Sequence, residues 1–260
     1  AKTLLSMFLL ASAKKNLSMC SFRLFDVQKP KEEEVWSTEV TDEDLENAVE
    51  DEFGVKYSKD WKRLLKAPSG LKGEYSIRKG VKVIGNSAFG LCSSLTNINI
   101  PNSVTTIGEG AFARCKSLTS INIPNSVTTI GEGAFKDCNS LISINIPNSV
   151  TIIENCAFED CESLTSITIP SSVVTIIGNP FCLWHGNLYN ESKAFIYEDH
   201  VLFNRNKTTL IAYRAKETSY TIPNSVTTIG EHAFSDCDSL TSINIPNSVT
   251  TIGEGAFNGC

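Results

Sequence analysis

The cysteines are the residues of this chain whose type and spacing could most readily do chemistry. There are nine, and six of them recur at one position of an internal repeat: Cys92, Cys115, Cys138, Cys161, Cys237 and Cys260. Adjacent strands of a stacked repeat lie about 4.8 Å apart, a separation that a disulfide can span. Cysteine is also a small, often buried apolar residue, so a repeated position favours buried free thiols. Cys20, Cys156 and Cys182 lie off this position, and Cys156 with a stacked neighbour is the pair to check for a disulfide.

Metal and catalytic motifs are weaker. Cys182-Leu-Trp-His185 resembles half of a metal site, but a zinc site needs a second pair at ligand spacing, and none follows. Gly108-Glu-Gly110 resembles a fragment of a phosphate loop, yet the same glycines recur in the other copies as turns. No Ser-His-Asp or Cys-His grouping stands at motif spacing. The sequence therefore predicts no catalytic, metal or cofactor site, and any catalytic group would have to lie in the irregular stretch 173–215.

The elements that position these residues are copies of one repeat, V-x-x-I-G-x-x-A-F-x-x-C-x-S-L-x-x-I-x-I-P-x-S, usually 23 residues apart. A fixed period of this length indicates a solenoid with one supersecondary unit per copy. The copies begin at Val81, Val104, Val127, Val150, Val173 or Val174, Val226 and Val249.

One unit can be interpreted residue by residue. Ile121-Asn122-Ile123 alternates as a short strand with isoleucine inward, and Pro124 ends that strand because it has no N–H. Residues 127–130 form a second extended piece, and residues 134–135 a brief helical or 3₁₀ turn. Such a unit buries its apolar groups only by stacking. We therefore expect one buried column of phenylalanines: Phe89, Phe112, Phe135, Phe158, Phe234 and Phe257.

The repeat resembles the BspA-like, or Treponema-type, class of leucine-rich repeats over residues 81–260. The resemblance implies a leucine-rich-repeat solenoid that is β-rich, with short parallel strands and brief helical turns, curved and right-handed. It also implies a secreted or cell-surface protein of the kind that mediates adhesion. The partners would be proteins, such as host extracellular matrix or cell-surface ligands.

A second internal repeat predicts two inserted β-hairpins. Residues 53–66 align with residues 199–212, and in both an apolar alternating run, a polar turn and a second apolar run follow each other. The pair resembles the hairpin insert of BspA-like proteins, with His200 and Arg214 in place of the usual glycine and proline, so we expect a looser or shifted turn there. The predicted organisation is an N-terminal segment over 1–52, a capping hairpin module over 53–80, and a repeat array over 81–260. A hairpin insert interrupts that array at about 182–222.

The distribution of charge and the two ends of the chain give further predictions. Net charge is −6, with acidic residues gathered between Glu32 and Glu52, and residues 42–53 predict a short amphipathic helix. Residues 1–13 have the order of a signal peptide, although a helix or tail is the alternative. No stretch reaches the roughly 20 apolar residues of a membrane span, and no basic patch suggests nucleic acid. Because the chain stops at Cys260, midway through a repeat, we expect the natural protein to continue.

The outward strand positions form the candidate binding surface. They are small and uncharged: Asn97, Asn99, Ser120, Asn122, Ser143, Asn145, Ser166, Thr168, Ser242 and Asn244. The irregular stretch adds Trp184, Tyr189, Tyr197 and Tyr213 as candidate anchors for a specific partner. The prediction is a non-catalytic extracellular or surface protein that mediates adhesion or protein binding. The alternative is a structural spacer or cytoplasmic scaffold that presents other domains.

Overall fold

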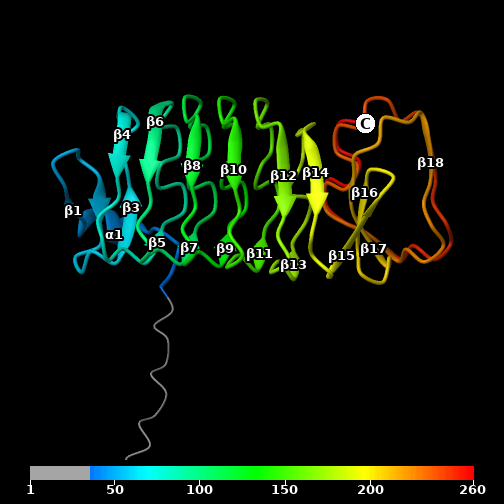
Figure 1. Ribbon diagram of the computed structural model, residues 1–260, viewed down its shortest axis with the longest axis horizontal. Helices are drawn as coiled ribbons and strands as arrows, with labels where there is room; N and C mark the ends of the chain where they lie inside the picture. The colour runs from blue at the N-terminus through cyan, green and yellow to red at the C-terminus, as the bar shows by residue number, and fades with distance from the viewer. Residues whose placement is uncertain (1–35) are drawn as a thin grey trace, which may run out of the picture. The chain divides into compact units, whose positions relative to one another are not determined.

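The computed structural model describes residues 36–260, which form a solenoid of short strands (Figure 1). The signal-like stretch at residues 1–13 and Cys20 lie outside the described residues. Each repeat contributes one strand to each of two sides of the solenoid, and a hairpin interrupts the array once. This arrangement confirms the predicted leucine-rich-repeat solenoid with two hairpins.

The first side is built by the L-x-x-I-x-I segments. Their strands pair in parallel in the order β10-β8-β6-β4, and Ile98, Ile121 and Ile144 stand in register. A further parallel pair joins β12 to β14, and another joins β18 to β20. The bounds are β4 Lys72–Ser76, β6 Ser94–Asn99, β8 Ser120–Asn122, β10 Ser143–Asn145, β12 Ser166–Ile169, β14 Asn187–Asn190, β18 Ser219–Thr221 and β20 Ser242–Asn244.

The second side is built by the two-residue strands of the repeats, most of them Thr-Ile, together with the strands of the two hairpins. An eight-stranded sheet runs β1-β2-β3-β5-β7-β9-β11-β13, and a five-stranded sheet runs β15-β16-β17-β19-β21. The bounds of the first are β1 Val49–Glu50, β2 Lys56–Tyr57, β3 Arg63–Lys66, β5 Val83–Ile84, β7 Thr106–Ile107, β9 Thr129–Ile130, β11 Ile152–Ile153 and β13 Thr175–Ile176. Those of the second are β15 Phe195–Glu198, β16 Val201–Asn204, β17 Thr209–Tyr213, β19 Thr228–Ile229 and β21 Thr251–Ile252.

The position of the degenerate repeat is settled by strand pairing. Thr175 pairs with Ile152 and Ile176 with Ile153, which places Val173 at the first position of the unit. Val173 is fully buried, whereas Val174 is 63% exposed. The unit therefore begins at Val173, and Val174 points to solvent.

The A-F segments form single turns rather than helices. Ala134 N donates to Gly131 O at 3.2 Å, but Phe135 N donates to Ala157 O of the next unit at 2.9 Å. Because alternate N–H groups bond across the stack, they cannot bond four residues back along the chain, as an α-helix requires. The expected brief helical turn is therefore a ladder of tight turns.

The phenylalanine column is confirmed, with one break. Ring centroids lie 5.5 Å apart between Phe112 and Phe135 and 5.8 Å between Phe135 and Phe158, with the planes within 5° of parallel. Phe181 extends the column from Phe158 at 6.3 Å. In a second column, Phe234 stacks on Phe257 at 5.1 Å, and Phe257 is only half-buried.

Four of the six thiols at the repeated cysteine position are buried, and none of the six is bonded to another. Cys115 Sγ donates to the carbonyl oxygen of Phe89 at 3.2 Å, and Cys138 and Cys161 repeat this contact one unit further. Burial raises the pKa of Cys92 to about 11 and that of Cys161 to about 12. These side chains therefore pack as neutral thiols, as the sequence predicted, whereas Cys237 is half-buried and Cys260 is exposed.

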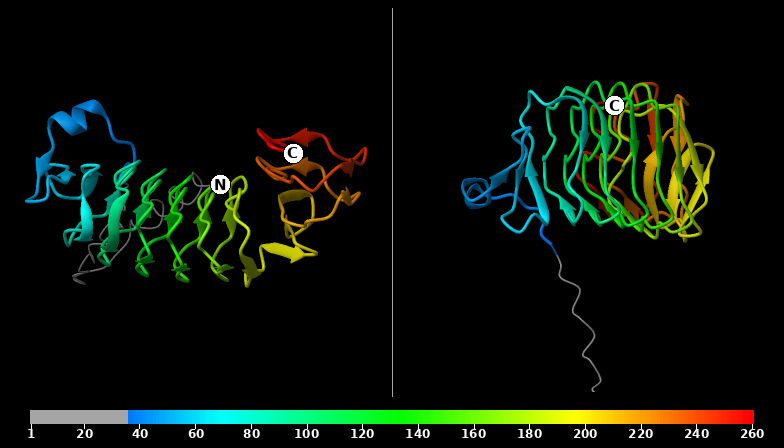
Figure 2. Two further views of the ribbon diagram at one scale, coloured as in Figure 1. Left: turned by 90° about the horizontal axis from the view of Figure 1, so that it is seen from above. Right: turned by 60° about the vertical axis from the view of Figure 1, so that its left-hand side comes forward.

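The inserted hairpin divides the core in two. Strands β15, β16 and β17 pair antiparallel, and β17 then pairs parallel with β19, so the hairpin becomes the first layer of the resumed array. One apolar cluster extends from Val55 to Ala212, and a second begins at Val201 and ends at Ala256. Figure 2 shows the resumed array, in orange and red, offset from the first array at this point.

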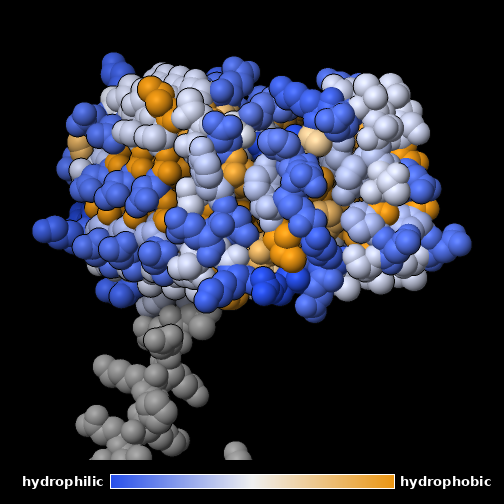
Figure 3. All heavy atoms as spheres, turned by 45° about the vertical axis from the view of Figure 1, so that its right-hand side comes forward, coloured by the Kyte–Doolittle hydropathy of each residue, from blue (hydrophilic) through white to orange (hydrophobic). Residues whose placement is uncertain are grey.

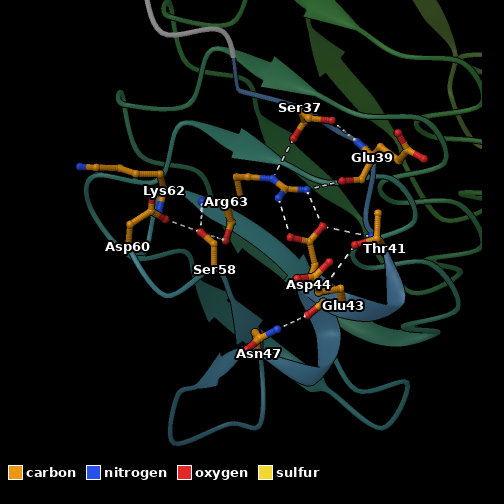
Figure 4. A network of polar contacts seen from close by, with 10 residues as sticks. All are labelled: Ser37, Glu39, Thr41, Glu43, Asp44, Asn47, Ser58, Asp60, Lys62 and Arg63. Carbon is orange, nitrogen blue, oxygen red and sulfur yellow. Dashed lines mark hydrogen bonds and ion pairs between the residues drawn. The ribbon is translucent and has the colours of Figure 1, made fainter.

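The first hairpin, β2–β3, stands at the start of the eight-stranded sheet, where helix α1 (Asp42–Glu46) and β1 precede it. A capping box starts α1, because Thr41 and Asp44 exchange side-chain to backbone hydrogen bonds of 3.1 Å. Arg63 donates to both oxygens of Asp44 and to the carbonyl oxygens of Ser37 and Glu39 (Figure 4). The helix predicted over 42–53 is too long, because the backbone enters β1 at Val49 and pairs with β2 instead.

Candidate functional site

The first candidate surface is the polar face of the first sheet. Asn97, Ser120 and Ser143 pair in one row, and Asn99, Asn122 and Asn145 in the next, all of them exposed. Rows one strand spacing apart offer an amide or hydroxyl about every 4.8 Å. Because amides and hydroxyls both donate and accept, such rows hydrogen-bond to an extended backbone or to polar side chains without charge selection.

The polar face ends in an aromatic side chain. Ser166 and Thr168 are exposed on β12, which lies beside β10. Strand β14 then pairs with β12 and puts Tyr189 directly beside Thr168. Tyr189 is 57% exposed, so it projects from the face at the position that asparagine occupies in earlier units. We call Asn97, Asn99, Ser120, Asn122, Ser143, Asn145, Ser166, Thr168 and Tyr189 the ladder face.

Two of the predicted positions form a separate patch. Ser242 and Asn244 are exposed on β20, where they pair with Ser219 and Thr221 of β18. Strands β18 and β20 make their own two-stranded sheet. The insert therefore divides the predicted surface into the ladder face and this smaller patch.

Two predicted anchors do not belong to a surface. Trp184 is 2% exposed and Tyr213 is 4% exposed, which corrects their assignment as partner contacts. Trp184 Nε1 donates to Leu164 O at 2.7 Å, and its ring packs against Phe181 at 5.7 Å. Tyr213 starts the second aromatic column on Phe234 at 5.0 Å. Both side chains fill the break between the two cores, whereas Tyr197 is half-buried.

A groove along the turn side is a second candidate surface that the sequence analysis did not single out. It encloses about 780 Å³ and is lined by Leu91, Ser93, Arg114, Lys116, Asp137, Asn139, Asp160 and Glu162. Leu91, Arg114, Asp137 and Asp160 occupy one repeat position, each with a left-handed backbone. That shared register aligns their side chains along the axis, and the repeat spacing was the signal that could have found them.

Charge changes sign along the groove. Arg114 and Lys116 line one part, and Asp160 and Glu162 line another. Arg114 Nε pairs with Asp137 Oδ2 at 3.2 Å between them. Burial, together with the neighbouring Glu162 and Asp137 carboxylates, raises the pKa of Asp160. The groove therefore suits a ligand with both signs of charge better than a uniformly charged polymer. Figure 3 shows hydrophilic and intermediate residues over most of the face in view, with smaller hydrophobic areas between them.

No helix among residues 36–260 is long and apolar enough to cross a membrane. The described surfaces instead consist of extended rows of side chains on a stacked scaffold. A chain with this fold is a leucine-rich-repeat solenoid, a class of repeat proteins that is generally non-enzymatic.

The chain belongs to the family of the BspA type leucine rich repeat region, which matches residues 73–184 and 212–260 in six copies. The unmatched stretch between these ranges contains β15, β16 and the start of β17 of the inserted hairpin. The family match therefore confirms the resemblance that the repeat motif suggested.

Solved structures agree with this assignment. A leucine rich cell surface protein of Faecalibacterium prausnitzii A2-165 is 36% identical, with a TM-score of 0.62, over 75% of this chain and 55% of that one. A leucine-rich repeat protein of Eubacterium ventriosum is 27% identical, with a TM-score of 0.53, over 79% and 60% of the two chains. The pneumococcal vaccine antigen PcpA is 25% identical, with a TM-score of 0.54, over 81% and 51%.

The chain thus spans between half and three fifths of the length of these solved relatives. A search of curated protein sequences finds no match.

Proposed function

We propose that this chain is a non-catalytic, secreted or cell-surface protein that binds protein ligands through its ladder face and thereby mediates adhesion. The observation that carries the proposal is the register of Tyr189 with Thr168 at the end of an exposed polar face. Tyrosine combines a large apolar ring with a hydroxyl, and such side chains dominate the energy of protein interfaces. The polar rows would supply many weak hydrogen bonds around that anchor.

The relatives support the location. The Faecalibacterium neighbour is described as a cell surface protein and the pneumococcal one as a vaccine antigen. Matrix proteins and partner-cell surfaces are therefore the first ligands to test. The uncharged ladder face would bind them with weak salt dependence, because few ion pairs would form there.

The test compares binding of the chain and of Tyr189→Asn to immobilised matrix proteins and to partner cells. Asparagine occupies the equivalent position at Asn99, Asn122 and Asn145, so this variant should keep the fold. Loss of the tyrosine anchor should weaken binding at least tenfold, equivalent to about 1.4 kcal/mol.

Phe53→Ala is the matched control, because Phe53 is also an exposed aromatic residue but lies in the N-terminal module. Its binding should equal that of the unaltered chain. Equal losses in both variants, or unchanged binding by Tyr189→Asn, would contradict the proposal.

One observation favours a spacer or cytoplasmic scaffold as a second candidate. All eight cysteines among residues 36–260 are free thiols, a state that a reducing compartment maintains. Fractionation of the producing cells separates the two candidates. Protein found only in the cytosol would exclude the surface function, and protease-accessible protein on intact cells would exclude the cytoplasmic one.

A further inference from the structure

One cluster of metal-ligating side chains lies where the repeat array is interrupted. Cys156, Cys182 and His232 each place one ligand atom within 4.8 Å of those of the other two. The two Sγ atoms are 3.4 Å apart, although the residues are 26 positions apart in the chain. We call these three residues the junction cluster. It joins the first array, which carries the cysteines, to the resumed array, which carries the histidine.

Stacking explains how the cluster forms. Cys156 N donates to Asn179 O at 2.9 Å, and Asn179 Nδ2 donates to His232 O at 2.9 Å. Cys156 and His232 hold the same repeat position as Gly110 and Gly133, and all four have a left-handed backbone. Side chains other than glycine are disfavoured there, and such exceptions gather at functional sites. Here two such non-glycine residues, Cys156 and His232, lie close together where the first array meets the resumed array.

Buried amides orient the imidazole. Asn155 Oδ1 accepts from Asn179 N at 3.0 Å, which fixes the amide so that Nδ2 faces His232 Nδ1 at 3.3 Å. With an N–H group facing it, Nδ1 is the unprotonated nitrogen of the ring. Asn155 and Asn179 are themselves buried polar residues. An ion would take the place of the Asn155 N–H at Nδ1, because the other ring nitrogen carries the proton.

We propose that the junction cluster binds one thiophilic divalent cation of the zinc class, through the Cys156 and Cys182 sulfurs and one ring nitrogen of His232. Zinc takes thiolate and imidazole ligands in tetrahedral sites, where ligand atoms are about 3.5–3.8 Å apart at the usual bond lengths. The sulfurs already stand close to that spacing, and the ion would draw the imidazole inward. Water would complete the fourth position.

Charge supports a cation at this place. Two thiolates balance the two positive charges of the ion, so binding adds no net charge to a nearly buried site; their two protons leave to solvent. The ion would also tie the two arrays together across the break in the core.

The C-x-x-H pair noted in the sequence is a different set. His185 is exposed and lies outside the cluster that contains Cys182. The partners of Cys182 come instead from two other repeats, which no local motif shows. This difference gives the test its sharpest control.

The test titrates the reduced, metal-free chain of residues 1–260 with Zn²⁺, and with Co²⁺ as an optical probe. Variants follow residues that other copies already carry: Cys156→Gly and His232→Gly match Gly133, and Cys182→Ala matches Ala113. We expect one ion per chain, a thiolate-to-cobalt charge-transfer band, and a rise in the thermal midpoint with Zn²⁺. Each variant should bind at least tenfold more weakly and lose that rise.

His185→Ala, Ser87→Gly and Cys138→Ala are the controls, because they remove a nearby histidine, a left-handed residue and a ladder thiol. They should bind as the unaltered chain does, and Tyr189→Asn should do the same, since this site is independent of the ladder face. Three results would overturn the proposal. They are absence of the cobalt band, equal weakening by His185→Ala, and a Cys156–Cys182 disulfide that forms on air oxidation despite saturating Zn²⁺.

Discussion

The guanidinium of Arg214 lies 4.5 Å above the ring of Trp184, and its Nη1 donates to the Trp184 carbonyl oxygen at 2.7 Å. Nη2 donates to Gly186 O, also at 2.7 Å. Arg214 follows the inserted hairpin, whereas Trp184 ends the first aromatic column. One cation therefore fastens the resumed array to the first array. Burial lowers the pKa of Arg214, but an arginine keeps its proton, so a buried charge is stabilised by the ring and two carbonyls.

Arg214→Ala should destabilise the chain by about 2–4 kcal/mol. The variant loses two charge-assisted hydrogen bonds and the cation–π contact, while relief of the buried charge offsets part of the loss. Urea unfolding monitored by tryptophan fluorescence measures this change. Lys216→Ala, at an exposed site two residues further along the chain, should change the free energy of unfolding by no more than about 0.5 kcal/mol. An equal effect of the two variants would show that the contacts of Arg214 with Trp184 and Gly186 do not stabilise the chain.

The phenylalanine column predicts a gradient of sensitivity. Phe135 is fully buried between two ring neighbours, so Phe135→Ala should cost about 3–5 kcal/mol. Phe257 is half-buried and stacks on Phe234 at 5.1 Å, so its truncation should cost less than half as much.

Hydrogen exchange would show the extent of the damage from Phe135→Ala. In a stacked array each unit contacts its neighbours, so amides near Phe112 and Phe158 should lose protection before those near Phe234. A uniform loss of amide protection across residues 36–260 would contradict the idea that each unit is stabilised by its immediate neighbours.

Two glycines of one repeat should respond differently to alanine. A Cβ at Gly131 would stand 2.7 Å from the carbonyl carbon of Gly108, whose backbone cannot move aside. At Gly133 the nearest atom is 3.7 Å away, so only the left-handed backbone is strained. We expect a loss of about 2–3 kcal/mol for Gly131→Ala and about 1 kcal/mol for Gly133→Ala, by thermal or urea unfolding. The reverse order would show that close approach of the units does not control this site.

The repeat predicted the structure correctly wherever the pattern within one unit decides which of its side chains are buried. The alternation of Ile121-Asn122-Ile123 and the recurrence of Phe135 are local patterns, and stacking preserves them in every copy. The hairpins were also predictable, because their alternation and polar turns are contained in a short stretch of chain.

Features that depend on the break in the array were not predictable. The aromatic residues around Trp184 and Tyr213 would look the same in the sequence whether the hairpin were exposed or packed as a layer of the core. The sequence therefore could not show that both side chains are buried. Arg214 in place of a proline suggested a looser turn, yet the side chain binds two carbonyl oxygens. Likewise, only the folded chain brings His232 to Cys156, because the inserted hairpin separates their two units in the sequence.

The ion pair of Asp44 with Arg63 predicts a pH-dependent contribution from the N-terminal module. The hydrogen bonds from Arg63 are the largest cause of a lowered pKa at Asp44, below its ordinary 3.8. A carboxyl group whose pKa is lower in the folded than in the unfolded protein stabilises the fold. This stabilisation is complete at pH values above the unfolded-state pKa, and it is lost as the pH falls through the folded-state pKa. Asp44→Asn should therefore cost stability near neutral pH and little in strong acid.

We expect a loss of about 1 kcal/mol near pH 7, because the pair is partly exposed and the capping box is weakened as well. Urea unfolding near pH 7 and near pH 2 measures the difference between the variant and the unaltered chain, which should approach zero in acid. Asp42→Asn is the control, since Asp42 opens the same helix but does not contact Arg63. A difference that persisted at low pH would mean that the amide disturbs packing, and the ion pair would then not be the cause.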